Sequence, residues 1–596
     1  MAFILLSSFA AAQVDAANYG AMRWRLVGPC RAGRVTTVSG VPGDFRTFYF
    51  GTPGGGIWMT TDAGRVWKPI FDQTHVASIG AIAVAASNPR IIYAGTGEQI
   101  AGKGVFKSTD GGASWTHVGL EETHFINGLL VDPTNPDVVL VAAFGDRQPG
   151  PNRGIYKTTD GGRTWKQVLI PAPRSGAVDI SFALDNPRTV YAAFWRSGPG
   201  AFGQQQAGES ERQQNGFLFK SDDEGDTWHP VGTEGLPTEP WGRTGVAAAP
   251  GNGGNRVYCI TEQGFFRSDD GGQRWQASTK DPRILGSFYF SRIFVDPNNA
   301  DVLYVAETSM YRSLDGGRTF EAWAGAPSGD DYHVLWIDPK GPQGAPAKLE
   351  NSPADVQSVR ASQNMIVGVD QGAAVSLDAG ATWSTWYNQP TGQFYHVSTD
   401  NQFPYWIYAA QQDSGSVAVA SRSNNGQITY RDWFSPSAME FSFILPDPKN
   451  PNLIYNDGWY GSVQKVDRVT GTVTPLFVRS GDWRTTNMPP LAWSPDAKTL
   501  YMGAQKVLKT NDGGANWQVI SDDLTVRPDT TRTATRDQAQ QAPRRPTGTL
   551  VELAVSRLQP SVIWTGASTG VVSLTQDGGK HWANVTPAGI PQRALV

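Results

Sequence analysis

The sequence has very little cysteine, little charge and no long hydrophobic run. Only two of its 596 residues are cysteines, Cys30 and Cys259, which excludes a disulfide framework or a cysteine-based metal site. We expect both thiols to be free and buried. Charged residues make up 17% of the chain and the formal net charge is -4, so the composition offers no basic surface for nucleic acid. No apolar run is long enough to span a bilayer, which argues against an integral membrane protein.

Glycine, proline and tryptophan are abundant by contrast, with 67 Gly, 40 Pro and 21 Trp. Frequent Gly and Pro indicate many turns, and abundant aromatic residues indicate many short packed strands. The composition therefore predicts an all-β protein. The chain is also much longer than one ordinary domain, which favours several units or a repeat array.

The first residues of the chain resemble a targeting segment. An apolar stretch is followed by Ala10 and Ala12, which are spaced as a small-x-small cleavage site. This pattern predicts a signal peptide over residues 1–16 and a secreted or periplasmic protein. The alternative is a short buried strand.

One pattern, S/T-x-D-x-G-x-x-W with a single Phe for Trp, recurs nine times. The Asp side chain can accept hydrogen bonds from N–H groups of its own turn, the Gly adopts a positive φ, and the Trp packs between sheets. We therefore predict that the box aspartates are structural and not catalytic. They are Asp62, Asp110, Asp160, Asp223, Asp270, Asp315, Asp378, Asp512 and Asp577.

The spacing of these boxes predicts tandem β-propellers, because each period has room for four short strands. Seven boxes are fairly evenly spaced and predict a seven-bladed ring over residues 20–388. The interval from Asp378 to Asp512 is too long for one blade, and its strand-like segments Trp406–Ala410 and Leu453–Tyr455 predict two blades without a box. About four blades of a second, truncated ring then occupy residues 389–596. A half-ring would expose edge strands, so closure in another way stays open.

The nine boxes resemble the Asp-box (BNR) repeats of sialidases, xyloglucanases and sortilin-type propellers. The whole chain resembles exported proteins labelled as BNR-repeat glycosyl hydrolases or sortilin-like (VPS10-type) propeller proteins. Segments that carry this wider resemblance are Trp24–Pro29, Gly33–Val35, Tyr395–Asp400, Ala410–Gly415 and Thr429–Trp433. A sialidase is disfavoured, because no arginine triad is recognisable.

The resemblance to xyloglucanases implies a substrate cleft between two propellers and an inverting mechanism. Inversion requires two carboxyl groups about 6.5–9.5 Å apart. In that family the first carboxylate belongs to a segment similar to Tyr49–Gly56, where this chain has Pro53 instead. The second belongs to a segment similar to Gln412–Gly415, which makes Asp413 the candidate catalytic residue. We consider Asp62, Glu98 and Asp370 as substitutes for the missing carboxylate.

Amide and aromatic residues near the boundary between the rings are candidate substrate-binding residues. Aromatic faces stack on sugars and amides bond their hydroxyl groups, which singles out Gln393, Tyr395 and Gln412 together with the pair Trp459 and Tyr460. A plain linker at the boundary and ordinary packing of the aromatic pair remain the alternatives.

A further polar cluster, Asp330, Asp331 and His333, precedes an apolar segment. It is either the polar start of a strand, which we favour, or a metal or acid–base site. We expect no cofactor and no metal.

Two functions remain after this reasoning, because propellers host both. The first is a carbohydrate-active protein, either a divergent glycoside hydrolase or a glycan binder, which uses the cleft between the propellers. The second is a sortilin-like propeller that binds a peptide or protein without catalysis. The partner is accordingly a polysaccharide or oligosaccharide, or a peptide or protein ligand. Whether the protein is an enzyme is left open, since Pro53 replaces one of the two expected carboxylates.

Overall fold

A computed structural model describes residues 19–590 and 594, apart from 147–149, 173, 197–216, 239–240, 286–291, 324–326, 328, 342–363, 459–460, 478–481 and 527–547. The described residues form eleven antiparallel sheets, ten with four strands and one with three, in which strands adjacent in sequence are paired. The helical elements with bounds inside these ranges are the short 3-10 turns η2 (Asp72–Thr74), η3 (Glu121–Thr123) and η4 (Tyr430–Asp432). The all-β prediction is confirmed. The predicted signal peptide, residues 1–16, lies outside the described residues.

Seven sheets form what we call the N-terminal set. The first four sheets consist of β1 (Thr37–Val41), β2 (Asp44–Gly51), β3 (Ile57–Thr60), β4 (Lys68–Pro69); β5 (Ile79–Val84), β6 (Ile92–Thr96), β7 (Val105–Ser108), β8 (Thr116–His117); β9 (Ile126–Val131), β10 (Val139–Ala143), β11 (Gly154–Thr158), β12 (Lys166–Leu169); β13 (Ser175–Ala183), β14 (Asn186–Arg196), β15 (Phe217–Ser221) and β16 (His229–Pro230). The next three sheets consist of β17 (Gly245–Ala248), β18 (Val257–Thr261), β19 (Gly264–Ser268), β20 (Gln276–Thr279); β21 (Arg292–Asp296), β22 (Asn299–Ala306), β23 (Met310–Ser313), β24 (Glu321–Ala322); β25 (Tyr332–Ile337), β26 (Met365–Val369) and β27 (Gly372–Ser376).

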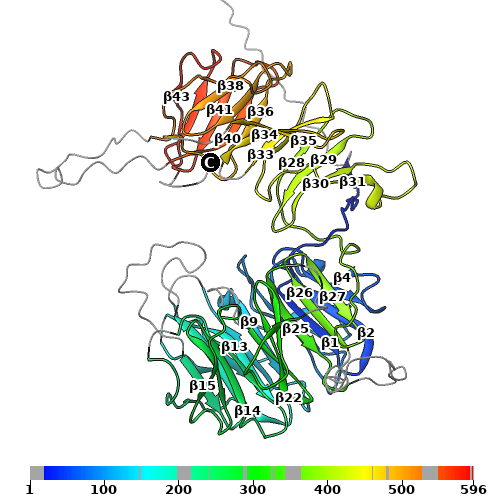
Figure 1. The fold of residues 1–596 in the computed structure, drawn as a ribbon, viewed down its shortest axis with the longest axis vertical. Helices are drawn as coiled ribbons and strands as arrows, with labels where there is room; N and C mark the ends of the chain where they lie inside the picture. The colour runs from blue at the N-terminus through cyan, green and yellow to red at the C-terminus, as the bar shows by residue number, and fades with distance from the viewer. Residues whose placement is uncertain are drawn as a thin grey trace, which may run out of the picture.

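Four sheets form the C-terminal set. They consist of β28 (Phe394–Thr399), β29 (Trp406–Gln411), β30 (Gly415–Ala420), β31 (Trp433–Phe434); β32 (Ile444–Pro446), β33 (Leu453–Asp457), β34 (Val463–Asp467), β35 (Thr472–Phe477); β36 (Leu491–Trp493), β37 (Leu500–Gly503), β38 (Val507–Thr510), β39 (Gln518–Val519); β40 (Leu550–Val555), β41 (Ile563–Ala567), β42 (Val572–Thr575) and β43 (Ala583–Asn584). Strands β29 and β33 coincide with the two strand segments predicted between the seventh and eighth boxes. Figure 1 shows the two sets as separate bodies joined at one side.

The first strands of successive sheets contact one another within each set. In the N-terminal set the series runs β1, β5, β9, β13, β17, β21, β25, and β25 packs back against β1, so the series closes. The core follows the same path, because Phe48 and Phe50 of the first sheet share a buried cluster with Val334 and Ile366 of the last. In the C-terminal set the main contacts join β28 to β32, β32 to β36 and β36 to β40.

Each box aspartate is engaged within its own turn. In the second box, Ser108 Oγ donates to Asp110 Oδ1 over 2.8 Å, and the Ser114 N–H donates to the same oxygen over 2.9 Å. The other eight boxes repeat these two bonds. Bonds from the Ser114 hydroxyl and N–H hold the pKa of Asp110 down at about 2. Turn contacts therefore hold the Asp110 carboxylate ionised.

The box tryptophans connect neighbouring sheets. The indole N–H of Trp115 donates to Ile70 O over 2.8 Å, and that of Trp275 donates to Gly232 O over 3.0 Å. In both cases the acceptor follows the last strand of the preceding sheet, so the ring closes the gap between two sheets while its polar atom stays satisfied. Trp582 makes the same bond to Ile520 O in the C-terminal set.

The two cysteines are free, but they differ in exposure. Cys259 is buried and Cys30 is exposed, so the expectation that both are buried is wrong for Cys30. The reason is that Cys30 lies in an irregular segment before β1 and not in a strand. In the described part of the chain, no helix has the length and apolar character needed to cross a membrane.

Candidate functional site

An irregular segment before β1 runs across the junction between the two sets. A guanidinium nitrogen of Arg25 donates to Ser421 O over 2.6 Å, and one of Arg31 donates to Ser416 O over 2.8 Å. Gly33 permits the closest approach, because a Cβ there would lie 2.9 Å from the Cα of Gly392. Real Cβ atoms do not come this close to backbone, so the junction requires glycine at position 33. We call residues 25–36 the junction segment.

Arg34, at the end of this segment, binds a carboxylate from each set. Its Nε lies 2.6 Å from Asp370 Oδ1, and a terminal nitrogen lies 2.6 Å from Asp413 Oδ2. Asp370 stands in the turn between β26 and β27, and Asp413 in the turn between β29 and β30 with a φ of 56°. The same terminal nitrogen also donates to Asp370 Oδ2 over 2.8 Å. One guanidinium therefore ties the two sets together.

The two carboxyl groups have opposite proton affinities. Burial raises the pKa of Asp413 to about 7, and the charge of Asp370 adds to this shift while Arg34 opposes it. Burial also acts to raise the pKa of Asp370, but the bond from His333 and the charges of His333 and Arg34 outweigh it and lower that pKa. The pair therefore holds a proton on Asp413 near neutral pH and keeps Asp370 ionised.

The distance between these carboxyl groups bears on catalysis. One oxygen of Asp370 and one of Asp413 bind the same nitrogen of Arg34, so the two oxygens are at most about 5–6 Å apart, whereas inversion needs about 6.5–9.5 Å and a water in between. The guanidinium also occupies the space between them. Asp370 is 1% exposed and Arg34 is 8% exposed, which leaves no access for a sugar. Asp370, which we considered as a substitute for the missing carboxylate, therefore lies near Asp413. The two carboxylates and Arg34 have the geometry of a salt bridge and not of an inverting catalytic pair.

The polar cluster before β25 joins the same network. His333 Nε2 lies 2.6 Å from Asp370 Oδ1. Burial raises the pKa of Asp331 to about 6, with further contributions from the charges of Asp370 and Asp330. In the described ranges, no group of three or more His, Cys, Asp or Glu side chains is arranged to hold a metal ion. His333 belongs to the start of β25 and helps to order Asp370.

Three of the predicted binding residues lie together beside Asp413. The Tyr395 hydroxyl donates to Gln412 Oε1, and Gln412 Nε2 donates to Asp413 Oδ1 over 2.7 Å. The backbone N–H of Gln412 donates to Gln393 O over 2.9 Å. The backbone N–H of Asp413 donates a hydrogen bond to Glu440 Oε2 over 2.5 Å. The other predicted pair, Trp459 and Tyr460, lies outside the described residues.

A cavity of about 410 Å³ opens at the junction, and Arg34 is one of its lining residues. We call it the junction cavity. Its lining includes Pro53 and Trp58 of the first sheet, and Gln393 and Phe394 at the start of the C-terminal set. Phe394 is 37% exposed. Pro53, which stands where the xyloglucanase resemblance implies a carboxylate, therefore does face a space between the two sets.

The other two candidate substitutes for the missing carboxylate lie elsewhere. Asp62 accepts hydrogen bonds within its own box turn. Glu98 lines a separate small cavity with Phe125, Arg243 and Arg292, which puts it among the first strands of the N-terminal set. Neither residue lines the junction cavity.

Sequence reasoning missed the role of Arg34. Its partners Asp370 and Asp413 are 336 and 379 residues away in the chain, so no local pattern connects them. The one available signal is the segment Gly33–Val35, in which a glycine that permits close packing precedes a buried arginine.

Comparison with known proteins gives partial matches. A family model described as Sortilin, neurotensin receptor 3 (Sortilin-Vps10) matches residues 103–265. A xyloglucanase of Paenibacillus sp. is 30% identical over 185 residues, which are 29% of this chain and 18% of the relative. The chain thus spans less than a fifth of that relative's length.

Among solved structures, a GH74 enzyme of Niastella koreensis aligns with a TM-score of 0.54 and 14% identity, covering 94% of this chain and 87% of that chain. PorZ, a surface component of the type-IX secretion system of Porphyromonas gingivalis, aligns with a TM-score of 0.47 and 12% identity, covering 92% of this chain and 72% of that chain. The chain is similar to sortilin-type and xyloglucanase sequences, and it shares its fold with a GH74 enzyme.

Proposed function

We propose that this chain is an exported tandem β-propeller protein that binds a glycan in the junction cavity and does not hydrolyse it. The fold shared with a GH74 enzyme and the partial match to a xyloglucanase support a carbohydrate ligand. In this proposal residues 20–388 form a seven-bladed propeller and residues 389–596 form four blades of a second one. Residues 1–16 act as a signal peptide that directs the protein to the periplasm or outside the cell.

The observation that carries this proposal is the lining of the junction cavity. It presents an exposed ring, Phe394, beside the amides of Gln393 and Gln99, and it has about 410 Å³ of space. Ligand sites commonly combine an apolar surface with a few polar groups that fix orientation. A sugar ring on Phe394, with its hydroxyl groups bonded to the amides, fits this combination.

The same geometry argues against hydrolysis. Pro53 lines the cavity at the position where the related enzymes are expected to carry an acid. Asp413 points its carboxylate at Arg34 and Gln412. We therefore assign Asp413 to the joint between the two propellers, and Tyr395 and Gln412 to its support.

Calorimetric titration with a xyloglucan heptasaccharide tests the proposal. We expect saturable binding to the wild-type protein and at least tenfold weaker binding to Phe394→Ala and to Gln393→Ala. Phe45→Ala is the matched control, because Phe45 is 50% exposed in the N-terminal set and does not line the cavity. Equal binding by Phe394→Ala and the control, or no binding to any neutral β-glucan oligosaccharide, would contradict the proposal.

A sortilin-like role in peptide binding is the second candidate. The match to the sortilin family model lies at residues 103–265, within the N-terminal set. The small cavity with Glu98, Arg243 and Arg292 is in this set, and its charges suit peptide termini. Arg243→Ala would weaken binding of a peptide library in this case, whereas Phe394→Ala would not.

A further inference from the structure

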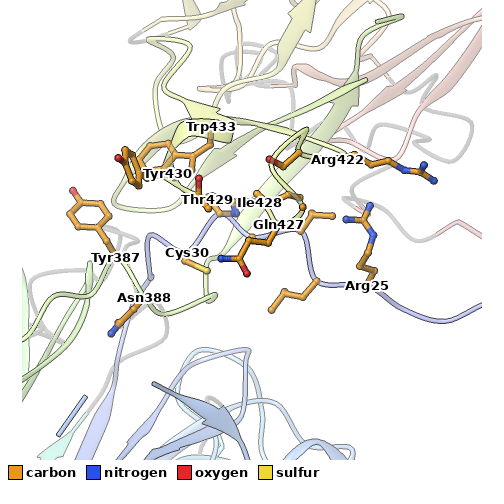
Figure 2. A pocket seen from close by; sticks show the side chains of 16 residues that line it. Arg25, Cys30, Tyr387, Asn388, Arg422, Gln427, Ile428, Thr429, Tyr430 and Trp433 are labelled. Carbon is orange, nitrogen blue, oxygen red and sulfur yellow. The ribbon is translucent and has the colours of Figure 1, made fainter. Parts of the chain in front are cut away.

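A second cavity is lined by the first residues of the junction segment. Its volume is about 940 Å³, and it is enclosed by residues 25–30, by Tyr387 and Asn388, and by part of the loop between β30 and β31. None of its lining residues lines the junction cavity. We call it the segment cavity. Figure 2 shows its labelled side chains, with aromatic rings gathered at one end and two guanidinium groups at the other.

The aromatic end consists of flat and accessible ring faces. The rings of Tyr387 and Trp433 are nearly parallel, with centroids 6.5 Å apart and an angle of 19° between the planes. Tyr387 is 61% exposed and Tyr430 is 74% exposed. Large exposed aromatic surface is costly in water unless a ligand covers it. The rings therefore form a platform on which another flat apolar face can stack.

The other end of the segment cavity carries positive charge. Arg25 and Arg422 line it, and Figure 2 shows both at the same end of the cavity. Arg25 uses one nitrogen to bond Ser421 O, which leaves its other donors for a ligand. In the described part of the chain no hydrogen bond or ion pair of the Arg422 guanidinium is found.

No carboxylate side chain balances this charge within the cavity lining. The nearest acidic residue in the sequence of the loop, Asp432, accepts a bond from the Thr429 N–H over 2.8 Å as part of a helix cap. A third guanidinium, that of Arg31, lies 5.5 Å from the centre of the Trp433 ring. The cavity lining therefore combines two arginines with aromatic faces and contains no carboxylate. Guanidinium forks match the geometry of carboxylate and sulfate oxygens.

We infer that the segment cavity is a binding site for an anionic saccharide. A pyranose ring stacks on the face of Tyr430 or Trp433, and a carboxylate or sulfate group on a neighbouring sugar binds Arg25 and Arg422. Gln427, between the two ends in Figure 2, supplies an amide for sugar hydroxyl groups. An acidic peptide would meet the same charges, but the flat ring faces suit a sugar ring better than a peptide side chain, which binds best in a deep apolar pocket. This site goes beyond the neutral-glycan site proposed above and does not depend on it.

Titration with hexagalacturonate tests this inference, with the fully methyl-esterified hexamer as an uncharged probe of the same length. We expect the esterified hexamer to bind at least tenfold more weakly, and the affinity for the charged hexamer to fall as salt is raised. A chondroitin sulfate hexasaccharide distinguishes recognition of sulfate from recognition of carboxylate alone. Binding of either charged probe supports the site.

Four variants locate the binding. Arg422→Ala and Tyr430→Ala should each weaken binding of the charged hexamer at least tenfold, because each removes one end of the site. Arg557→Ala is the control, since Arg557 is an exposed arginine of the C-terminal set outside the cavity. Phe394→Ala should leave this binding unchanged, which separates the site from the junction cavity.

Three results would overturn the inference. The first is the absence of binding by both charged saccharides. The second is binding that Arg422→Ala and Arg557→Ala affect equally. The third is a glutamate hexapeptide that binds more tightly than either saccharide and loses that affinity in Arg422→Ala, since this result would assign the cavity to an acidic peptide.

Discussion

The Asp box recurs in every sheet of the N-terminal set, whereas the first two sheets of the C-terminal set lack it. Seven of the nine boxes precede β28, and among the described bonds the indoles of Trp115, Trp165 and Trp275 donate to the preceding sheet. The sheets β28–β31 and β32–β35 carry no box. There the Arg468 guanidinium lies 4.9 Å from the centre of the Trp406 ring and 4.3 Å from that of Phe434. A cation on two rings thus links neighbouring sheets in place of a buried indole.

This difference shows that neighbouring four-stranded sheets can pack against each other without an Asp box. A buried tryptophan contributes through apolar area and one satisfied hydrogen bond. A half-exposed arginine over aromatic rings contributes less. The N-terminal set, whose series of strand contacts also closes from β25 to β1, should therefore be the more stable of the two.

Removing a box tryptophan should have the largest effect. Trp275 is 6% exposed and belongs to a buried cluster with Val246 and Phe266. Trp275→Ala leaves a cavity and an unbonded Gly232 carbonyl, and we expect the free energy of unfolding to fall by about 3–5 kcal/mol. Urea denaturation followed by tryptophan fluorescence measures this loss. A loss below about 1 kcal/mol would show that the boxes do not hold the sheets together.

A change at Asp413, in the joint between the two sets, should have an intermediate effect on the free energy of unfolding, and this effect should depend on pH. The pKa of Asp413 is raised from 3.8 to about 7, so its contribution to stability is present below the unfolded value and is lost as the pH rises toward 7. Asp370, whose pKa is lowered, contributes in the opposite direction but only at more acidic pH. Between about pH 5 and pH 8 the Asp413 contribution changes together with that of Asp331, whose pKa is raised to about 6, so the Asp413 part is isolated by comparing wild type with a variant at position 413.

Asp413→Asn should remove that dependence. We expect the difference in unfolding free energy between wild type and variant to change by about 1–2 kcal/mol from pH 5 to pH 8, after allowance for solvent screening, with the variant gaining at the higher pH. Urea denaturation at the two pH values measures this change. Asp522→Asn, at an exposed aspartate of the C-terminal set, is the control. Parallel pH profiles for wild type and Asp413→Asn would show that burial and the charge of Asp370 do not hold a proton on Asp413.

Removing Arg468, which links two sheets that lack a box, should have the smallest effect on the free energy of unfolding. Arg468→Ala removes the cation over Trp406 and Phe434, and we expect a loss of about 0.5–2 kcal/mol. The same denaturation experiment measures it. A loss equal to that of Trp275→Ala would mean that both devices contribute alike and would remove the contrast between the two sets.

Much of this architecture follows from local sequence, and the candidate site follows only in part. The all-β fold, the strands at Trp406 and Leu453, and the turn bonds of Asp110 all arise from residues close in sequence, where turn chemistry and periodicity act directly. The neighbourhood of Gln412 and Asp413 was also found from a short motif.

What sequence reasoning missed depends on long-range contacts. Arg34 meets its carboxylates only because the junction segment crosses between the two sets. The segment cavity combines Arg25 with Arg422 and Tyr387 with Trp433, and these residues stand in irregular segments that carry no periodic signal. Such segments are positioned by the sheets they connect, so their partners become visible only in the folded chain.

The most direct test of the account is an assay of reducing-end release from xyloglucan by wild type and Asp413→Asn, run beside titration of the heptasaccharide with both proteins. The account predicts heptasaccharide binding by both proteins and no release of reducing ends by either. Release by the wild type that falls by several orders of magnitude in Asp413→Asn would contradict it, because Asp413 would then be a catalytic acid and not part of the joint.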